Sequence, residues 1–266
     1  MNLSPLELFL QIKNKPSILF ENYLYIRPKG QPLQLFALNK PQRIFMDLVE
    51  KDIAKGKPER YIVCKNRQVG LSTFSEGLTF HHTITNPSYK SIIVAPERPK
   101  AQELFRISQL FYDRLPDWLR PMKLYRTKNN LVFENPNENE RRTNPGLGSD
   151  IQITHARNVA LPRGTPLMAA HLSETPYYDD YMDELYPALS NAIPYTPGTL
   201  ITIESTPRGK GGWYYDMYYA AKNGENDFTP VFLPWYIDPQ TFWPYPLDKY
   251  EEDEILNSLD EEEEIL

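Results

Sequence analysis

The stretch CKNRQVGLST at residues 64–73 decides the fold of this chain. It follows a short apolar run at residues 61–63 and precedes a segment with helical spacing, so it predicts a strand, a loop and a helix in succession. In such a loop, glycine lets backbone N–H groups approach phosphate, and the start of the helix adds positive potential. The sequence therefore predicts a phosphate-binding loop, whose usual pattern is GxxxxGK followed by Ser or Thr.

The loop departs from that pattern in the position of its cation. With Gly70 as the second glycine and Ser72 as the magnesium-binding hydroxyl, Leu71 occupies the usual lysine position. The cation would then come from the front of the loop, from Lys65 or Arg67, and we expect Lys65 to contact the γ-phosphate. The alternative is an ordinary polar turn between a strand and a helix. The predicted nucleotide-binding residues of the loop are Lys65, Asn66, Arg67, Gln68, Val69, Gly70, Leu71, Ser72 and Thr73.

Composition narrows the class of protein. With 266 residues, of which 41% are hydrophobic, the chain can form one large domain or two small ones around a real core. It has no apolar run of about 18 residues and no signal-peptide pattern, so we predict neither a membrane span nor a signal peptide. One cysteine excludes an internal disulfide, and four histidines show no zinc spacing. The net charge of −6 argues against a passive nucleic-acid binder.

Apolar runs alternate with segments of helical spacing along most of the chain. This alternation predicts an α/β fold with a mainly parallel central sheet flanked by helices. We predict an N-terminal arm and helix at residues 1–35, a main domain at 36–248 and an acidic linker at 249–266. The predicted helices are 41–55, 72–85 and 99–115, and the predicted strands are 61–64, 91–95, 130–134, 150–156, 167–172, 199–204 and 231–233.

The stretch LMAAHLSE at residues 167–174 predicts a buried strand that ends in an acidic residue. In phosphate-loop ATPases a carboxylate at the end of a neighbouring strand activates the attacking water, and Glu174 suits that role. Ser173 occupies a position where an aspartate often stands, and it would hold magnesium weakly or through water. The alternative for Glu174 is a carboxylate that caps a strand end.

Three further segments have residues that suit an ATP site. The stretch TLITIESTPRG at residues 199–209 ends a strand with Ser205 and Thr206, whose hydroxyls can sense the γ-phosphate by changing hydrogen-bond partner. Arg163 can stabilise transition-state charge in a neighbouring subunit, and the Gln42 amide can pair with adenine. Taken singly, these residues also suit a turn, a surface arginine and a solvent-facing helix residue. Their order along the chain makes chance a weaker explanation.

The stretches KNRQVGLST, LMAAHLSE and IESTPRGKGGWYYDMY resemble the ATPase half of the large terminase subunit, the DNA-packaging motor of tailed phages. The resemblance covers residues 36–235 and implies a P-loop NTPase of the RecA/ASCE-like type, with an additional strand and a conserved glutamate. Ser173 departs from the usual aspartate of the family. The sequence after Glu251 is too short for the nuclease domain of terminases, so we expect no nuclease activity in this chain.

The resemblance also implies roles for individual residues. Gln42 would contact adenine, and Lys65 and Arg67 would contact phosphates. Ser72 and Ser173 would bind magnesium, and Glu174 would activate water. Arg163 would act on a neighbouring subunit's ATP, while Ser205 and Thr206 would couple hydrolysis to movement.

The activity implied by the resemblance is Mg²⁺-dependent ATP hydrolysis that drives double-stranded DNA into a procapsid. The implied partners are DNA, the portal protein, the small terminase subunit and further copies of the chain in a ring, in the host cytoplasm while docked on the procapsid. We expect Arg141, Arg142 and Lys210 to contact DNA phosphates. The alternatives are a non-catalytic DNA- or portal-binding scaffold on a degenerate P-loop, and a helicase-like P-loop translocase, which would need a second RecA-like domain.

Overall fold

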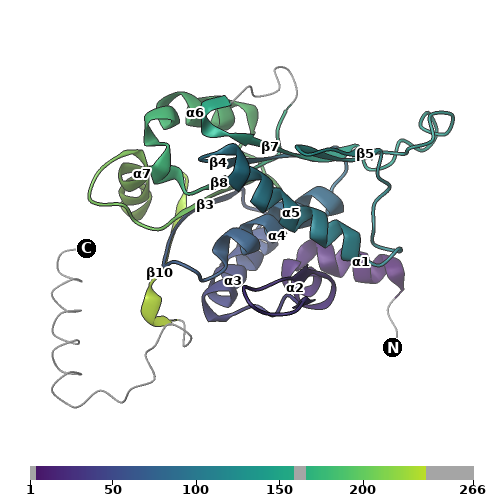
Figure 1. Cartoon of the computed structure of the whole chain (residues 1–266), viewed down its shortest axis with the longest axis horizontal. Helices are drawn as coiled ribbons and strands as arrows, with labels where there is room; N and C mark the ends of the chain where they lie inside the picture. The colour runs from purple at the N-terminus through teal and green to yellow at the C-terminus, as the bar shows by residue number, and fades with distance from the viewer. Residues whose placement is uncertain (1–3, 159–165, 238–266) are drawn as a thin grey trace, which may run out of the picture.

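The computed structural model describes residues 4–158 and 166–237, and its frame is one eight-stranded sheet (Figure 1). The strand order is β10-β3-β9-β8-β4-β7-β6-β5. The strands from β10 to β7 in this order are parallel, while β6 and β5 continue the sheet antiparallel. The prediction of a mainly parallel sheet is therefore confirmed. The strand bounds are β3 Glu59–Lys65, β4 Lys90–Ala95, β5 Tyr125–Arg126, β6 Asn130–Phe133, β7 Ser149–His155, β8 Ala169–Ser173, β9 Leu200–Ser205 and β10 Thr229–Leu233.

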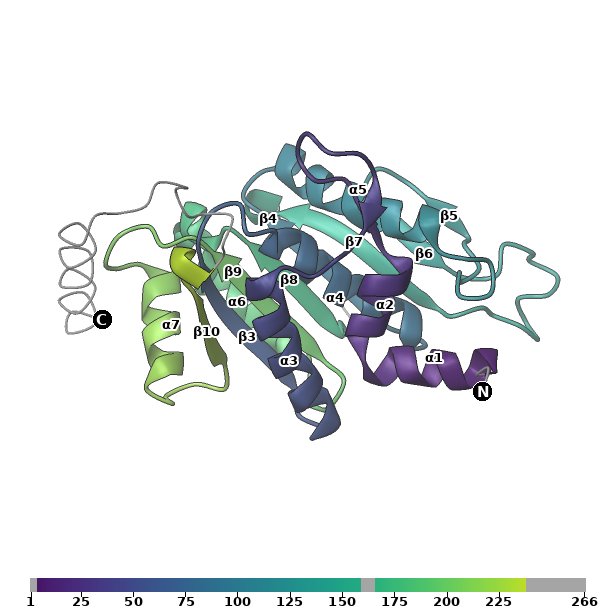
Figure 2. The same ribbon diagram turned by 90° about the horizontal axis from the view of Figure 1, so that it is seen from below.

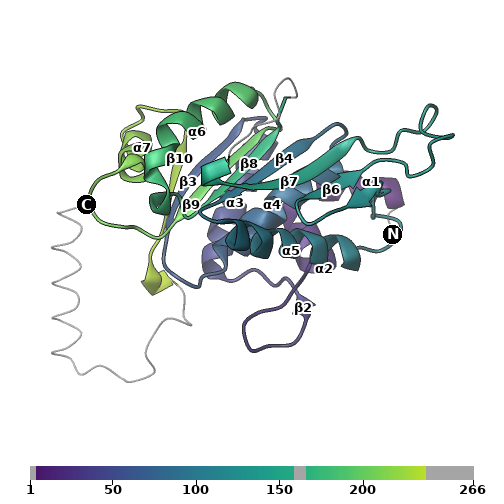
Figure 3. The same cartoon turned by 45° about the horizontal axis from the view of Figure 1, so that its top comes forward.

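Helices cover both faces of the sheet. Helices α1 to α5 lie on one face, and α6 and α7 lie on the other (Figures 1 and 3). Seen from below, α1, α2 and α3 stand in front of the sheet (Figure 2). The helix bounds are α1 Pro5–Asn14, α2 Pro16–Tyr23, α3 Lys40–Ala54, α4 Leu71–Thr85, α5 Arg98–Arg114, α6 Asp179–Ala192 and α7 Trp213–Lys222, with 3-10 turns at η1 Ala156–Asn158, η2 Thr175–Tyr177 and η3 Trp235–Ile237.

Strand β3 shows why the sequence forms a sheet with two covered faces. Tyr61 and Val63 pack into the apolar core on the α4 side, whereas Ile62 packs into the core under α6 and α7. Successive side chains of a strand point to opposite faces, so a parallel strand covered on both sides has a continuous apolar run. The strand continues into Lys65, one residue beyond the predicted end.

The N-terminal segment belongs to the same core as the main domain. Two helices, α1 and α2, are followed by a short hairpin of β1 Tyr25–Ile26 and β2 Gln34–Leu35. Ile12 and Phe20 are fully buried in the core that surrounds α4. At Gly77 of α4, an added Cβ would lie 2.4 Å from the Phe20 ring, so this helix needs glycine where α2 crosses it. The predicted domain limits stay predictions, and residues 249–266 lie outside the described part.

No helix among the described residues is long and apolar enough to span a membrane.

Candidate nucleotide site

The carboxyl ends of β3, β9 and β8 lie side by side in the middle of the sheet (Figure 3). Cys64 pairs with Ser205, and Glu204 in turn pairs with Ser173. Strand β9 is therefore inserted between the strand that leads into the phosphate loop and the strand that leads to Glu174. Because ligands of parallel α/β sheets bind at the carboxyl ends of the strands, the three segments that follow these strands define the candidate site.

The phosphate loop turns sharply before α4. Gln68 and Gly70 have φ values of 64° and 71°, in the left-handed region. A Cβ at position 70 would also lie 2.7 Å from Nε2 of Gln42, so glycine is required there for both space and conformation. No side chain caps the start of α4. The first backbone N–H groups of this helix are thus available to an anion.

Gln42 lies against the back of the loop. Its amide oxygen accepts a hydrogen bond from the backbone N of Asn39 at 3.0 Å, and its Nε2 donates to the carbonyls of Val69 at 3.3 Å and Gly70 at 3.0 Å. The side chain is buried in α3. A hydrogen bond donated to adenine would require one of the two Nε2 bonds to be given up, whereas the amide oxygen keeps one lone pair for an adenine donor. The adenine contact stays a prediction.

The two candidate cations have different surroundings. Lys65 is buried at the end of β3, and its Nζ lies 3.0 Å from Oε2 of Glu204. Arg67 is exposed, and its guanidinium makes no hydrogen bond or ion pair with the described residues. To contact a phosphate, Lys65 would have to bridge the phosphate and Glu204 or break its ion pair with Glu204. Arg67 has no such ion pair with the described residues. Which of the two contacts the γ-phosphate stays a prediction.

Glu204 is the centre of the site, and sequence reasoning missed it. Its side chain is fully buried, and Oε1 accepts hydrogen bonds from Oγ of Ser72 at 2.9 Å and from Oγ of Ser173 at 2.6 Å. Nε2 of His171 lies 3.4 Å from the same oxygen. One signal was available in the sequence: a glutamate inside the apolar strand LITIES must be paired, because an isolated buried charge is costly.

A second buried carboxylate continues this network behind the site. Nδ1 of His171 lies 2.7 Å from Oε1 of Glu76, and the other oxygen of Glu76 accepts a hydrogen bond from Ser108 at 2.9 Å. Burial alone would raise the pKa of Glu204, but the charges of Lys65 and His171 lower it to about 2. Burial alone would lower the pKa of His171, but its two glutamate partners raise it to about 9. These opposite shifts favour an ionised Glu204 beside a protonated His171.

Glu174 directly follows β8 and has a left-handed backbone, with φ 58° and ψ 42°. This conformation is uncommon outside glycine and recurs at functional sites. The backbone N of Glu174 donates to the carbonyl of Glu204 at 2.8 Å, which ties it to β9. Its half-buried carboxylate makes no hydrogen bond or ion pair with the described residues. Such a carboxylate suits a water-activating base, and this role stays a prediction.

The Ser205 and Thr206 pair lies beside the loop. The buried Ser205 hydroxyl donates to the backbone carbonyl of Thr206 at 2.9 Å. Thr206 also lines a hollow of about 330 Å³ at the mouth of the loop, which combines apolar and basic side chains. The lining residues are Cys64, Lys65, Asn66, Arg67, Thr206, Pro207, Phe232, Leu233, Pro234 and Trp235. Those from β10 onward were not predicted as site residues.

The other predicted residues are Arg163 and three basic residues proposed to contact DNA. Arg163 lies outside the described residues. Arg141 and Arg142 lie between β6 and β7, near one end of the strand order, whereas Lys210 lies after β9, toward the other end. Nε of Arg141 donates to the carbonyl of Asn135 at 3.0 Å. The structure does not bring these three basic residues together, and their contact with DNA stays a prediction.

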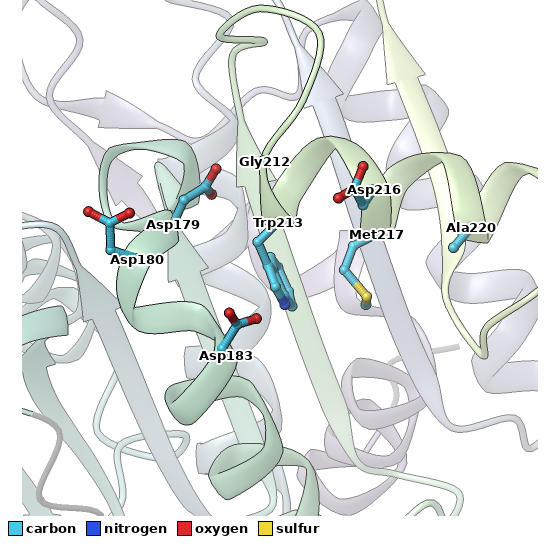
Figure 4. A pocket seen from close by; sticks show the side chains of 8 residues that line it. All are labelled: Asp179, Asp180, Asp183, Gly212, Trp213, Asp216, Met217 and Ala220. Carbon is cyan, nitrogen blue, oxygen red and sulfur yellow. The ribbon is translucent and has the colours of Figure 1, made fainter.

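A second hollow, of about 500 Å³, lies between α6 and α7 (Figure 4). Its acidic lining residues are Asp179, Asp180, Asp183 and Asp216. Their negative charge repels a polyphosphate, so this hollow is not the nucleotide site. Within the described part of the chain, no group of three or more His, Cys, Asp or Glu residues is arranged to hold a metal ion.

The fold matches solved structures of phage large terminases. Against the HK97 bacteriophage large terminase the TM-score is 0.63 at 14% identity, over 92% of this chain and 51% of that chain. For the Thermus phage P74-26 large terminase ATPase domain it is 0.51 at 18% identity, over 67% and 77%. For the large terminase of a thermophilic bacteriophage in complex with ATP-γ-S it is 0.53 at 11% identity, over 82% and 49%. No family model and no curated protein matches the sequence.

The chain therefore matches these large terminases in its fold, an α/β fold with a mainly parallel sheet flanked by helices, as the sequence predicted. It spans 51% of the HK97 protein, that is, about half of its length. The large terminase of the thermophilic bacteriophage has been solved with ATP-γ-S and with ADP.

Proposed function

We propose that this chain is the ATPase motor of a viral DNA-packaging terminase, which hydrolyses Mg-ATP to move double-stranded DNA into a procapsid. One observation carries the proposal: Lys65 and Ser72 both contact Glu204 on the inserted strand β9, and the backbone N of the strand-end Glu174 bonds to the carbonyl of the same residue. The similarity of the fold to a terminase solved with ATP-γ-S supports the choice of nucleotide.

The residues of the site suit in-line attack of water on the γ-phosphate. The open N–H groups of the loop and a cation, Lys65 or Arg67, would neutralise the charge that develops on the phosphate oxygens. Glu174 would position the attacking water and accept its proton. Ser72 and Ser173 would hold Mg²⁺, which prefers oxygen ligands and would supply positive charge to the phosphates.

Ser205 and Thr206 would couple hydrolysis to movement. The Ser205 hydroxyl bonds to the carbonyl of the next residue, and it can exchange this partner for another when the γ-phosphate leaves. Such an exchange would move the segment between β9 and α7, which includes Lys210.

The motor would work as a ring. Arg163 would reach the ATP of a neighbouring copy, and Arg141, Arg142 and Lys210 would contact DNA phosphates without reading sequence. The portal protein and the small terminase subunit would be its partners, in the host cytoplasm while the motor is docked on the procapsid.

ATP turnover by the Glu174→Gln variant tests the function. We expect turnover to fall about 100-fold or more, because the variant cannot accept the proton of the water, while ATP binding is retained. Glu184→Gln, an exposed glutamate of α6, is the matched control and should behave like the wild type. Turnover by Glu174→Gln equal to that of the wild type would reject the glutamate assignment.

The ring is tested by mixing variants. Arg163→Ala and Glu174→Gln proteins, each inactive alone, should partly restore hydrolysis when they assemble together. Absence of ATP binding by the wild type at millimolar concentration with Mg²⁺ would instead support a non-catalytic DNA- or portal-binding scaffold.

A further inference from the structure

Glu204 lies where the proposed ATP site needs a carboxylate and Ser173 has none. Magnesium bound to a nucleotide is usually held by one or two protein carboxylates as well as by the phosphates. Ser173 ends β8 without a charge, but Glu204 is its register partner on the adjacent strand β9. The Ser173 hydroxyl donates to Oε1 of Glu204 at 2.6 Å. The charge missing from β8 is thus present one strand away, within hydrogen-bond distance.

We propose that Glu204 supplies the carboxylate for the Mg²⁺ ion of bound ATP, in direct contact or through one water, and that Ser173 orients this carboxylate. The inference rests on the proposed ATPase function. It moves the acidic magnesium residue from β8 to the inserted strand β9.

The direction of the Ser72 hydrogen bond supports this assignment. The Ser72 hydroxyl donates its proton to Oε1 of Glu204 at 2.9 Å, so its lone pairs remain for a cation. The other carboxylate oxygen, Oε2, is fully buried, and among the described residues its polar partner is Lys65. Oε2 lies 3.0 Å from Nζ of Lys65, the cation beside the loop. A carboxylate oxygen has two lone pairs, so Oε2 can accept a further positive partner beside this lysine.

The carboxylate is also held in place from behind. His171 lies between Glu204 and Glu76, at 3.4 Å and 2.7 Å, and Ser108 donates to the far oxygen of Glu76 at 2.9 Å. Partners of this kind orient a metal ligand.

The rival role for Glu204 is that of a counter-ion that keeps Lys65 and the loop in position. The two roles differ in how nucleotide binding depends on magnesium. A counter-ion affects binding equally with and without Mg²⁺, whereas a magnesium carboxylate affects binding only when Mg²⁺ is present.

The experiment measures the affinity of a fluorescent ATP analogue in Mg²⁺ and in EDTA for wild type and Glu204→Gln. Glutamine keeps the size of the side chain and still accepts the serine hydroxyls, but it lacks the charge. In the wild type, Mg²⁺ should strengthen binding of the analogue relative to EDTA. We expect this gain to be about tenfold or more smaller in the variant, whereas the affinity in EDTA should not fall. Electron paramagnetic resonance of Mn²⁺ with ADP should show a matching loss of protein-bound metal.

Two further variants keep the result clear of folding effects. Glu59→Gln is the matched control, because Glu59 is another buried glutamate of the same sheet, bonded to His82 at 3.1 Å at the start of β3. It should retain the full effect of Mg²⁺. The double variant Ser173→Asp with Glu204→Gln returns the carboxylate to β8 and should restore the effect of Mg²⁺.

The outcomes separate this inference from the function on which it rests. Wild type that binds the analogue, with Glu204→Gln showing the same gain from Mg²⁺, would overturn the inference and leave the ATPase proposal standing. An equal loss of affinity in Mg²⁺ and in EDTA would favour the counter-ion role and also overturn it. Wild type that binds the analogue in neither condition would overturn the ATPase proposal and this inference with it.

Discussion

Replacement of Gln42 by leucine is the sharpest test of how the phosphate loop is held. Leucine fills nearly the same volume but makes none of the three hydrogen bonds of the amide, to Asn39 N and to the carbonyls of Val69 and Gly70. Loss of the capping interaction costs about 1 kcal/mol, and each neutral hydrogen bond to the loop is worth about 1 kcal/mol. We expect the free energy of unfolding to fall by about 2–3 kcal/mol, measured by urea denaturation.

The effect on binding shows which part of the nucleotide Gln42 serves. If the amide positions the loop, the variant weakens ATP and inorganic tripolyphosphate by the same factor, because both are held by the loop. If the distorted loop makes binding about 1.4 kcal/mol less favourable, the Kd of each ligand rises about tenfold. Isothermal titration calorimetry of both ligands measures the two factors.

The exposed helix residue Gln11 provides the control, and Gln11→Leu should change neither affinity. Weaker binding of ATP with unchanged binding of tripolyphosphate would refute the positioning role. That result would support the adenine contact, because tripolyphosphate has no base.

Two other predictions concern the buried charges. The pKa of His171 rises from 6.5 to about 9 in the folded protein, so the stability it contributes is full below about pH 6.5 and is lost as the pH rises toward 9. Urea denaturation between these pH values should show a falling free energy of unfolding, by up to about 1.4 kcal/mol per pH unit, and His171→Gln should flatten this slope; an unchanged slope would contradict the assignment. Lys65→Met should lower the free energy of unfolding by about 3–5 kcal/mol because it leaves the Glu204 carboxylate without its lysine, whereas Arg67→Met at an exposed position should change it by about 0.5 kcal/mol or less. Equal losses in the two variants would disprove the importance of the buried pair.

Local patterns in the sequence predicted many of the elements because those patterns have local causes, although helices α6 and α7 were not predicted. The apolar run at 61–64 became β3 Glu59–Lys65, and the segment at 72–85 became α4 Leu71–Thr85. The short strands β1, β2 and β5 were not predicted, since two-residue strands have no measurable periodicity. The residue pattern of the loop also predicted a glycine turn at Gly70, and the structure has this turn.

The site was predicted only in part, because a partner at long range is invisible in a single sequence. Glu204 stood inside the quoted stretch IESTPRG, yet it was given no role, since its neighbours in the chain do not contact its carboxylate. Its hydrogen-bond partners Ser72 and Ser173 are 132 and 31 residues away along the chain. In the same way, the sequence does not reveal that the Gln42 amide bonds to carbonyls of the phosphate loop, because these lie in a different segment. Gln42 was therefore assigned to adenine instead.

The sequence by itself determined the strand–loop–helix unit, the alternation of strands and helices, and the order of the phosphate loop, Glu174 and the Ser205-Thr206 pair. These features depend on backbone preference and apolar periodicity, which act over a few residues. Only the tertiary structure decided that β9 enters the sheet between β3 and β8, and thus that Glu204 lies between Lys65, Ser72 and Ser173. The physical reason is that strand order follows from the packing of whole helices on both faces of the sheet. A buried charge then takes its partners from whichever strands that packing places beside it.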